Sequence, residues 1–482
     1  MKSNIISFTI GVLLIVVGVA ELIPAFVDWH RANYDNAVAF LMCSVVSLFF
    51  GGVLVLSNAS YEPTLNIRQA FLLTTLSWFS MSFFASFPFY LSDLHLSFTD
   101  SFFEALSGIT TTGSTVLSGL DTMSHGILIW RSMTQWIGGI GIVAFAFVFL
   151  PFLRIGGMQL FQTESSDRSE KVMPRSHALI LSLFEVYCLL TILCMVVYYV
   201  LGMSWFDALN HALTTIPTGG YSTHDASFGY FDSTPLQLAA SLFMLLGGIP
   251  FVLYVKLLFQ GRVAFLQDDQ VRTILSMIIV FAAILTMWLV YHSDYSVIDS
   301  FRYVVFNIVS VVTTTGYATT DYTLWGAFPI MFFFFLTYMG ACAGSTTGGL
   351  KVMRLVIAVK TVNKQLKALI YPHGVFTVRY QGRPVDRNVA ITVVSFLVLY
   401  VASNAVLTMA LSLTGLDFST AISGAATAIA NVGPGIGDII GPAGNFSTLP
   451  DTAKWLLCAG MLIGRLEIMT VILLFRYEFW RN

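Results

Sequence analysis

Four stretches of this chain align without gaps, and each ends at a glycine: residues 104–113, 211–220, 307–316 and 424–433. Each stretch carries a hydroxyl six residues before its glycine and a β-branched side chain four residues before it. The hydroxyl residues are Ser107, Thr214, Ser310 and Thr427, and the β-branched residues are Ile109, Ile216, Val312 and Ile429. An internal repeat decides the architecture of a chain before any single motif does. Four copies of this one predict four backbone loops around a common axis.

The composition places these loops in a membrane. Of the 482 residues, 56% are hydrophobic and only 10% are charged, whereas about 25% are charged in soluble domains. A helix crosses the bilayer in about 20 apolar residues. The stretches that meet this condition are 5–27, 36–57, 68–91, 126–153, 177–202, 235–259, 271–292, 324–341, 388–413 and 452–476. We expect the first to be a retained helix, because no small-residue cleavage site precedes Glu21 and Pro24.

The distribution of charge predicts the orientation. With both termini in the cytoplasm, 19 of the 24 Lys and Arg residues lie on the inner side, as the positive-inside rule requires. The outer connections collect acidic residues, and several of these flank the four aligned stretches. Clustered acids at the mouth of a pathway raise the local cation concentration. The outer face is therefore predicted to be a vestibule that attracts cations.

Four apolar stretches next to the aligned glycines are too short to cross a bilayer. They span about 98–109, 205–216, 299–312 and 417–429. Each begins near an aspartate that can cap free amides, namely Asp100, Asp207, Asp299 and Asp417. A re-entrant half-helix of this kind points its partially negative C-terminal end at the axis, which favours a cation. Irregular backbone at membrane depth is tolerated only where it is buried or lines water.

These elements predict an all-α polytopic membrane protein. Four pseudo-repeats of helix, pore half-helix, filter loop and helix surround a central pore, and two extra transmembrane helices precede them. The predicted boundaries are 1–66 for the N-terminal two-helix segment, 67–154 for repeat 1, 155–262 for repeat 2, 263–375 for repeat 3 with a gating loop, and 376–482 for repeat 4.

The third repeat contains a glycine-rich run in place of a continuous second span. Each glycine in a helix costs about 1 kcal/mol relative to alanine, so the helix is expected to break there. A flexible break on the cytoplasmic side of the loops is a candidate gate. Its predicted residues are Gly340, Gly344, Ser345, Thr346, Thr347, Gly348 and Gly349.

Arg465 lies inside the last predicted span. A charge at that depth costs at least about 2.5–3.5 kcal/mol and normally faces water or a partner. Glu467 lies two positions on, on a different face of a helix, so a local ion pair is not the obvious explanation. Arg465 is expected either to face the pore as an electrostatic barrier, which we favour, or to pair elsewhere in the bundle.

Five segments together carry a family resemblance: 131–141, 219–225, 313–321, 344–351 and 464–468. The chain resembles, over essentially its whole length, the TrkH-type membrane subunits of bacterial Trk potassium-uptake systems, in the superfamily of Trk, Ktr and HKT transporters. The resemblance implies a homodimer in the bacterial inner membrane with one pore per subunit. It also implies a cytosolic TrkA-like regulatory ring that binds NAD, ATP or ADP. This chain has no dinucleotide fingerprint of its own, so any control by nucleotides must come from such a partner.

The resemblance also implies that the four loops select K⁺, with backbone carbonyls replacing its hydration shell. The predicted filter residues are Thr111, Thr112, Gly113, Thr218, Gly219, Gly220, Thr314, Thr315, Gly316, Asn431, Val432 and Gly433. The fourth loop lacks the threonine run of the others, so its register rests on spacing alone. By the same resemblance, K⁺ is expected to be the transported ion, and no cofactor is expected on this chain.

Two other functional classes are alternatives for a chain of this composition. A secondary K⁺ symporter coupled to H⁺ or Na⁺ stays open, although alternating-access folds typically show two related halves and this chain shows four units. An intramembrane enzyme is disfavoured, because the sequence has no H-E-x-x-H motif and no aspartate-rich diphosphate site. The basic stretch 354–387 and the 154–176 loop are predicted to contact the cytosolic ring.

Overall fold

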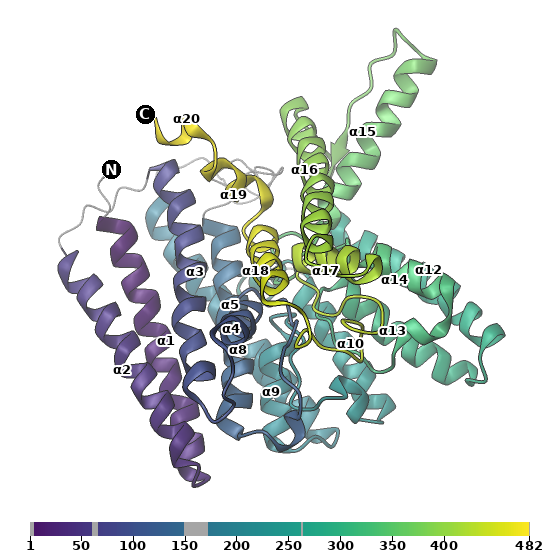
Figure 1. The fold of residues 1–482 in the computed structure, drawn as a ribbon. Coiled ribbons are helices and arrows are strands. Elements are labelled where there is room, and N and C mark those ends of the chain that lie inside the picture. The colour runs from purple at the N-terminus through teal and green to yellow at the C-terminus, as the bar shows by residue number, and fades with distance from the viewer. Residues whose placement is uncertain (1–3, 60–65, 149–171, 262–263, 482) are drawn as a thin grey trace.

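The computed structural model describes residues 4–59, 66–148, 172–261 and 264–481. Two long helices, α1 (Asn4–His30) and α2 (Tyr34–Ser57), pack along each other at the edge of the molecule (Figure 1). Seven described helices are long and apolar enough to cross a membrane, or up to nine if two bent helix pairs are each counted as one span. The prediction of a helical protein with many spans is confirmed.

After α1 and α2, four units follow with the same order of elements. Each begins with a long helix: α3 (Ile67–Leu91), α8 (Val172–Val200), α12 (Asp269–His292) and α16 (Arg387–Ser412). Each continues with a short helix: α4 (Phe98–Ile109), α9 (Trp205–Thr215), α13 (Val297–Val312) and α17 (Phe418–Ala430). The short helices lie within two residues of their predicted bounds. We number the units repeats 1 to 4.

The caps of the short helices differ from the prediction in three of the four repeats. Ser97, Ser204 and Ser296 are the N-caps, and each accepts a hydrogen bond from the amide of the aspartate three residues later. Asp100, Asp207 and Asp299 accept a hydrogen bond from the cap hydroxyl instead. Only Asp417 is itself the cap. A serine fits the cap position because its short hydroxyl reaches the amide of the third helical residue.

The final span of repeat 2 and that of repeat 4 are broken, which corrects the prediction of continuous helices over 235–259 and 452–476. In repeat 2, α10 (Thr234–Gly248) and α11 (Phe251–Gln260) meet at 90°. In repeat 4, α18 (Asp451–Arg465) and α19 (Ile468–Leu474) meet at 113°. Pro250 has no amide to continue the first helix. At the second break, Glu467 has a φ of 66°, which a helix cannot contain.

The final spans of repeats 1 and 3 differ from these two bent helix pairs. In repeat 1, α5 (His125–Val148) is continuous over its described length. In repeat 3, α14 (Ala327–Thr337) ends early, and residues 338–351 form a non-helical segment before α15 (Val352–Ile370). We call residues 338–351 the glycine-rich loop.

The elements that follow the glycine-rich loop project from the same end of the molecule as the two termini, but on its other side (Figure 1). They are α15 and a two-stranded hairpin of β1 (Arg379–Tyr380) and β2 (Arg383–Pro384). The chain ends with α20 (Tyr477–Trp480). In the described part of the chain, short 3-10 helices lie in the connections: η1 (Leu120–Thr122), η2 (Ser227–Tyr230), η3 (Phe265–Gln267) and η4 (Tyr322–Trp325).

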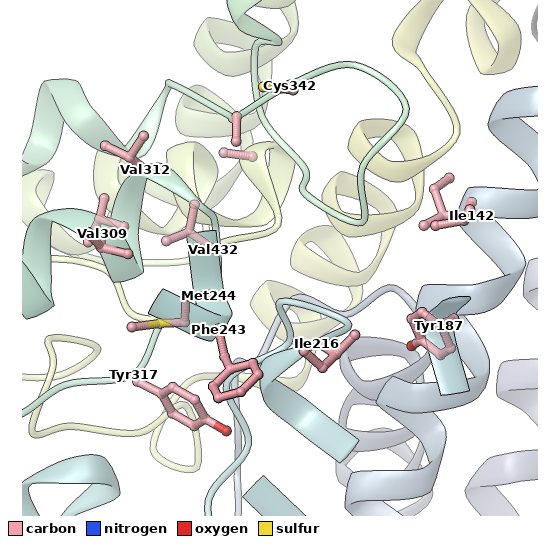
Figure 2. Packing of buried hydrophobic residues seen from close by; sticks show 14 of the residues in the cluster. Ile142, Tyr187, Ile216, Phe243, Met244, Val309, Val312, Tyr317, Cys342 and Val432 are labelled. Carbon is pink, nitrogen blue, oxygen red and sulfur yellow. The ribbon is translucent and has the colours of Figure 1, made fainter. Parts of the chain in front are cut away.

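One hydrophobic cluster joins all four repeats. Figure 2 shows members from each repeat close together: Ile142, Ile216, Val312 and Val432, with Cys342 of the glycine-rich loop beside them. The repeats therefore pack around a shared centre rather than as separate domains. Burial at this centre means that any polar backbone there needs a hydrogen-bond partner or water.

Candidate functional site

The four aligned glycines lie in loops with the same backbone conformation. We call residues 111–113, 218–220, 314–316 and 431–433 the Thr/Gly loops. The glycines have φ values of 86°, 80°, 82° and 108°. Two residues earlier, the φ values of Thr111, Thr218, Thr314 and Asn431 are 50° to 55°. Non-glycine residues rarely adopt positive φ, so its recurrence at four equivalent positions marks one shared structural requirement.

The amides of these loops are directed back to the short helices. The residue before each glycine donates its N–H to the carbonyl of the hydroxyl residue that the alignment singled out. These bonds are Thr112 to Ser107, Gly219 to Thr214, Thr315 to Ser310 and Val432 to Thr427, at 2.8–3.1 Å between N and O. Amides held on the helix side leave the loop carbonyls available on the other side, apart from those of Gly219 and Gly433, each of which accepts a side-chain donor.

The glycines close a ring of four repeats. A Cβ on Gly113 would overlap the carbonyl oxygen of Gly219 in repeat 2, and one on Gly220 would overlap that of Thr315 in repeat 3. A Cβ on Gly316 would overlap the carbonyl oxygen of Val432 in repeat 4. A Cβ on Gly433 would lie 2.9 Å from the carbonyl oxygen of Thr112, which returns to repeat 1. Each glycine is therefore required both for its φ and for its contact with the next repeat.

Gln135 on α5 also contacts the ring, and the sequence analysis gave it no role. Its amide nitrogen donates to the carbonyl of Gly219 at 2.7 Å, and its amide oxygen accepts from the N–H of Tyr221 at 3.1 Å. A buried amide in an apolar span was the available signal, because such side chains normally have a polar partner.

A buried ion pair supports the first loop from behind. The Arg131 guanidinium lies 2.8 Å from a carboxylate oxygen of Glu104. Arg131 also donates to the carbonyl of Ser222 at 2.9 Å, and Glu104 accepts the amide of Val116 at 3.0 Å. Both charges are almost fully buried, and the hydrogen bonds compensate their desolvation. The pair ties the chain beyond Gly113 to the chain beyond Gly220.

An open cavity of about 270 Å³ lies over the ring and is lined by all four glycines. Of the predicted acidic residues, Asp225 lines this cavity, and both Asp225 and Asp121 make contacts between loops. Asp225 accepts the amides of Gly119 and Leu120 at 2.9 and 3.2 Å. His224 lies 2.5 Å from Asp121. Burial lowers the pKa of His224, but its hydrogen bonds to Asp207 and Asp121 outweigh burial and raise it. The hydrogen bond from His224 lowers the pKa of Asp121.

On the opposite side of the ring, the glycine-rich loop is buried and hydrogen-bonded. The amide of Gly340 donates to the carbonyl of Leu350 at 2.9 Å, and that of Leu350 donates to Tyr338 at 3.1 Å. The carbonyl of Gly344 accepts the amide of Phe251 at 2.9 Å, so the loop satisfies backbone exposed at the break between α10 and α11. Composition predicted a flexible segment, whereas these contacts hold it in place.

The glycine-rich loop also contacts the Thr/Gly loops directly. Thr346 Oγ1 donates to the carbonyls of Ile216 and Gly247, both at 3.0 Å, and accepts from Thr218 at 3.2 Å. The amide of Gly348 donates to Thr314 Oγ1 at 2.7 Å. The other predicted gate residues, Ser345, Thr347 and Gly349, line a cavity of about 40 Å³ in the same segment. The predicted gate and filter residues therefore lie against one another.

Arg465 lines that small cavity from the last turn of α18. It is buried, and its three side-chain nitrogens have no hydrogen-bond partner among the described residues. Glu467 pairs instead with Arg354 of α15, at 2.7 Å, and Arg354 stacks on the ring of Phe396. Arg465 was expected either to face the pore or to pair elsewhere in the bundle. The contacts of the described residues contain no ion pair for Arg465.

Comparison with known proteins places these features in a family. The family model described as TrkH, cation transport protein, matches residues 37–481. The chain is 46% identical to the Trk system potassium uptake protein TrkI of Halomonas elongata, over 98% of this chain and 96% of that protein. It is 35% identical to the Trk system potassium uptake protein TrkH of Escherichia coli, over the full length of both.

The fold comparison agrees. The crystal structure of the potassium transporter TrkH from Vibrio parahaemolyticus covers the whole chain with a TM-score of 0.92 at 34% identity. The matched proteins are transporters rather than enzymes. On sequence and on structure, this chain belongs to the TrkH family of cation transport proteins.

Proposed function

We propose that this chain carries K⁺ into the cell through the ring of Thr/Gly loops, with the loop carbonyls replacing the ion's hydration shell. The observation that carries the proposal is the closed ring, in which each glycine contacts the carbonyl of the next repeat. The uniform direction of the amides toward the short helices supports it, since carbonyls are left for the ion. The identity of the ion as K⁺ is inferred from the relatives, which are named as potassium uptake proteins.

The glycine-rich loop and Arg465 form the proposed gate below this filter. The loop is packed against Thr218 and Thr314, and Arg465 places an unpaired positive charge beside it. A fixed charge in a low-dielectric path repels a cation strongly. The pathway is therefore closed until the glycine-rich loop and α15 move.

The chain is proposed to act as a homodimer in the bacterial inner membrane, with both termini cytoplasmic. Its partner is a cytosolic ring that binds NAD, ATP or ADP, in keeping with relatives named as parts of a Trk system. The basic stretch 354–387, which includes α15 and the hairpin, projects from the fold and supports a docking role (Figure 1). The second predicted contact, the 154–176 loop, lies largely outside the described residues.

Glycine variants of the full chain in liposomes test the filter. Gly113→Ser and Gly316→Ser add a side chain where φ is positive and a neighbouring carbonyl is in contact. The K⁺/Na⁺ permeability ratio should fall in both. Gly261→Ser is the matched control, because Gly261 also has a positive φ but a Cβ there meets no neighbour. An unchanged ratio in both loop variants would refute the filter.

The same liposomes separate a channel from a symporter. K⁺ flux down its own gradient, with no Na⁺ present and the proton gradient collapsed, is expected if the pathway is passive. Flux that appears only when H⁺ or Na⁺ can move with K⁺ would instead support the coupled alternative.

A further inference from the structure

The residue that directly follows the glycine of each Thr/Gly loop differs between repeats in whether it carries a hydroxyl. These residues are Ser114, Tyr221, Tyr317 and Pro434. Three carry a hydroxyl and are almost fully buried, and the fourth is a proline. The family comparison and the filter assignment give these residues no role, although they flank the ring on its outer side.

Each of the three hydroxyls bonds to the repeat that precedes its own in the ring. Ser114 Oγ donates to the carbonyl of Gly433 at 2.9 Å, which joins repeat 1 to repeat 4. The Tyr221 hydroxyl lies 2.9 Å from the carbonyl oxygen of Glu104 and 3.2 Å from that of Ser114, which joins repeat 2 to repeat 1.

Tyr317 makes the equivalent connection from repeat 3 to repeat 2. Its hydroxyl lies 2.5 Å from Thr214 Oγ1 and 3.3 Å from the carbonyl oxygen of His211. The side chain belongs to the buried cluster shared by the repeats (Figure 2). A hydrogen bond in such dry surroundings is stronger than one in water, and breaking it leaves a buried partner unsatisfied.

Among the described residues, the joint between repeats 4 and 3 has no such bond. Pro434 has neither an N–H nor a hydroxyl, and it meets repeat 3 through its ring, whose Cδ would lie 2.9 Å from a Cβ on Gly316. The difference is specific to this lateral contact. Behind the loops, all four repeats retain a tie, made by Glu104 to Thr115, His211 to Ser222, Asn307 to Thr319 and Ser423 to Ile436.

We propose that Ser114, Tyr221 and Tyr317 are positioning residues that fix the width of the carbonyl ring. The joint at Pro434 is then the compliant joint, the place where the ring changes width most easily. The inference rests on the proposed filter. Na⁺ is smaller than K⁺, so the ring must contract to coordinate it. Lateral bonds between neighbouring repeats resist contraction, and the joint without one limits how strictly K⁺ is selected.

The test compares permeability ratios of the full chain in liposomes, with K⁺ and Na⁺ as the probe ions. Tyr221→Phe and Tyr317→Phe keep the aromatic side chain and remove only its hydroxyl. Each should lower the K⁺/Na⁺ ratio by about two- to tenfold, the range that one net hydrogen bond allows. Tyr254→Phe is the matched control, because its buried hydroxyl donates to the carbonyl of Leu246 within repeat 2. That variant should leave the ratio unchanged.

A gain-of-function variant tests the compliant joint. Pro434→Ser places at repeat 4 the donor that repeat 1 has, and it should raise the K⁺/Na⁺ ratio. Pro442→Ser, in the wall of the outer cavity, is its control. If a tyrosine variant does not fold, Ser114→Ala makes the same test at the 1–4 joint with a smaller change.

The outcomes distinguish the two proposals. If Gly113→Ser and Gly316→Ser lower the ratio while Tyr221→Phe, Tyr317→Phe and Ser114→Ala leave it unchanged, the filter stands and the positioning role is refuted. If the glycine variants themselves leave the ratio unchanged, the filter fails and the positioning role fails with it. A Pro434→Ser protein that folds and selects K⁺ no better than the parent refutes the compliant joint.

Discussion

Two buried arginines show how differently the same residue is used. Arg131 donates to Glu104, Ser222 and Thr115, so its charge is paired and its donors are occupied. Arg465 has three donor nitrogens without a partner among the described residues. A buried charge without compensation is costly, and such a cost persists in a fold only where the charge serves another purpose. Arg131 therefore supports the ring, and Arg465 is the better candidate for an obstruction.

Arg465→Ala should raise K⁺ flux through the unstimulated protein, because it removes the charge beside the glycine-rich loop. An increase of about tenfold corresponds to about 1.4 kcal/mol off the barrier. The measurement is K⁺ efflux from liposomes without any cytosolic partner. Arg465→Lys keeps the charge and should stay close to the parent. An Arg465→Ala protein that folds normally and conducts no faster would argue against the barrier role.

At the scale of elements, the glycine-rich loop is a structural part of two repeats. It belongs to repeat 3, yet it satisfies backbone at the break between α10 and α11 and bonds the Thr/Gly loop of repeat 2. Its glycines allow these close approaches. A Cβ on Gly340 would overlap the carbonyl oxygen of Gly348, and one on Gly348 would overlap that of Ala430. Movement of this loop would therefore have to break specific hydrogen bonds, which hold it against the neighbouring repeats.

Thr346→Val should weaken the closed position of the loop, because it removes two hydrogen bonds to carbonyls and keeps the side-chain shape. Basal K⁺ flux is expected to rise severalfold while the K⁺/Na⁺ ratio is retained. Flux and selectivity are measured on the same liposomes. Thr361→Val is the control, since Thr361 bonds only the carbonyl of Ile357 within α15. Equal flux in the parent and the Thr346→Val protein would contradict this prediction.

At the scale of the whole molecule, the two N-terminal helices are fixed to repeat 1 at one end. Asp28 on α1 is buried and accepts the amide of Gly126 at 2.8 Å and the hydroxyl of Ser124 at 3.0 Å. Asn36 on α2 exchanges two hydrogen bonds with Asp93, each 2.9 Å long. Asp28 thereby satisfies an amide at the start of α5, the helix that also carries Arg131 and Gln135.

Asp28→Ala should destabilise the protein without changing which ion it selects. Loss of the carboxylate leaves a buried amide unsatisfied, which costs about 1–3 kcal/mol. Thermal unfolding in detergent should show a lower Tm, and the K⁺/Na⁺ ratio of the folded protein should match the parent. Asp35→Ala, at an exposed position of α2, is the control for charge. A Tm unaffected by Asp28→Ala would show that α1 is not held there.

The repeat count, the four short helices and the helical, multi-span class could all be predicted from the sequence. These properties depend on contiguous residues, because hydropathy and local hydrogen bonding are set within a few turns of chain. The Ser-x-x-Asp pattern at Ser97, Ser204 and Ser296 was equally local and could have been read as the cap signal.

The remaining features could not be predicted from the sequence, because the contacts that produce them join distant parts of the chain. Pro250 ends α10 locally, but the amide of Phe251 at that break is satisfied by the carbonyl of Gly344, 93 positions later. Glu467 pairs with Arg354, which is 113 positions away. The hydroxyls of Tyr221 and Tyr317 bond residues more than 100 positions away. Such pairings arise when four repeats close around one centre, and no local pattern encodes which side chains then meet.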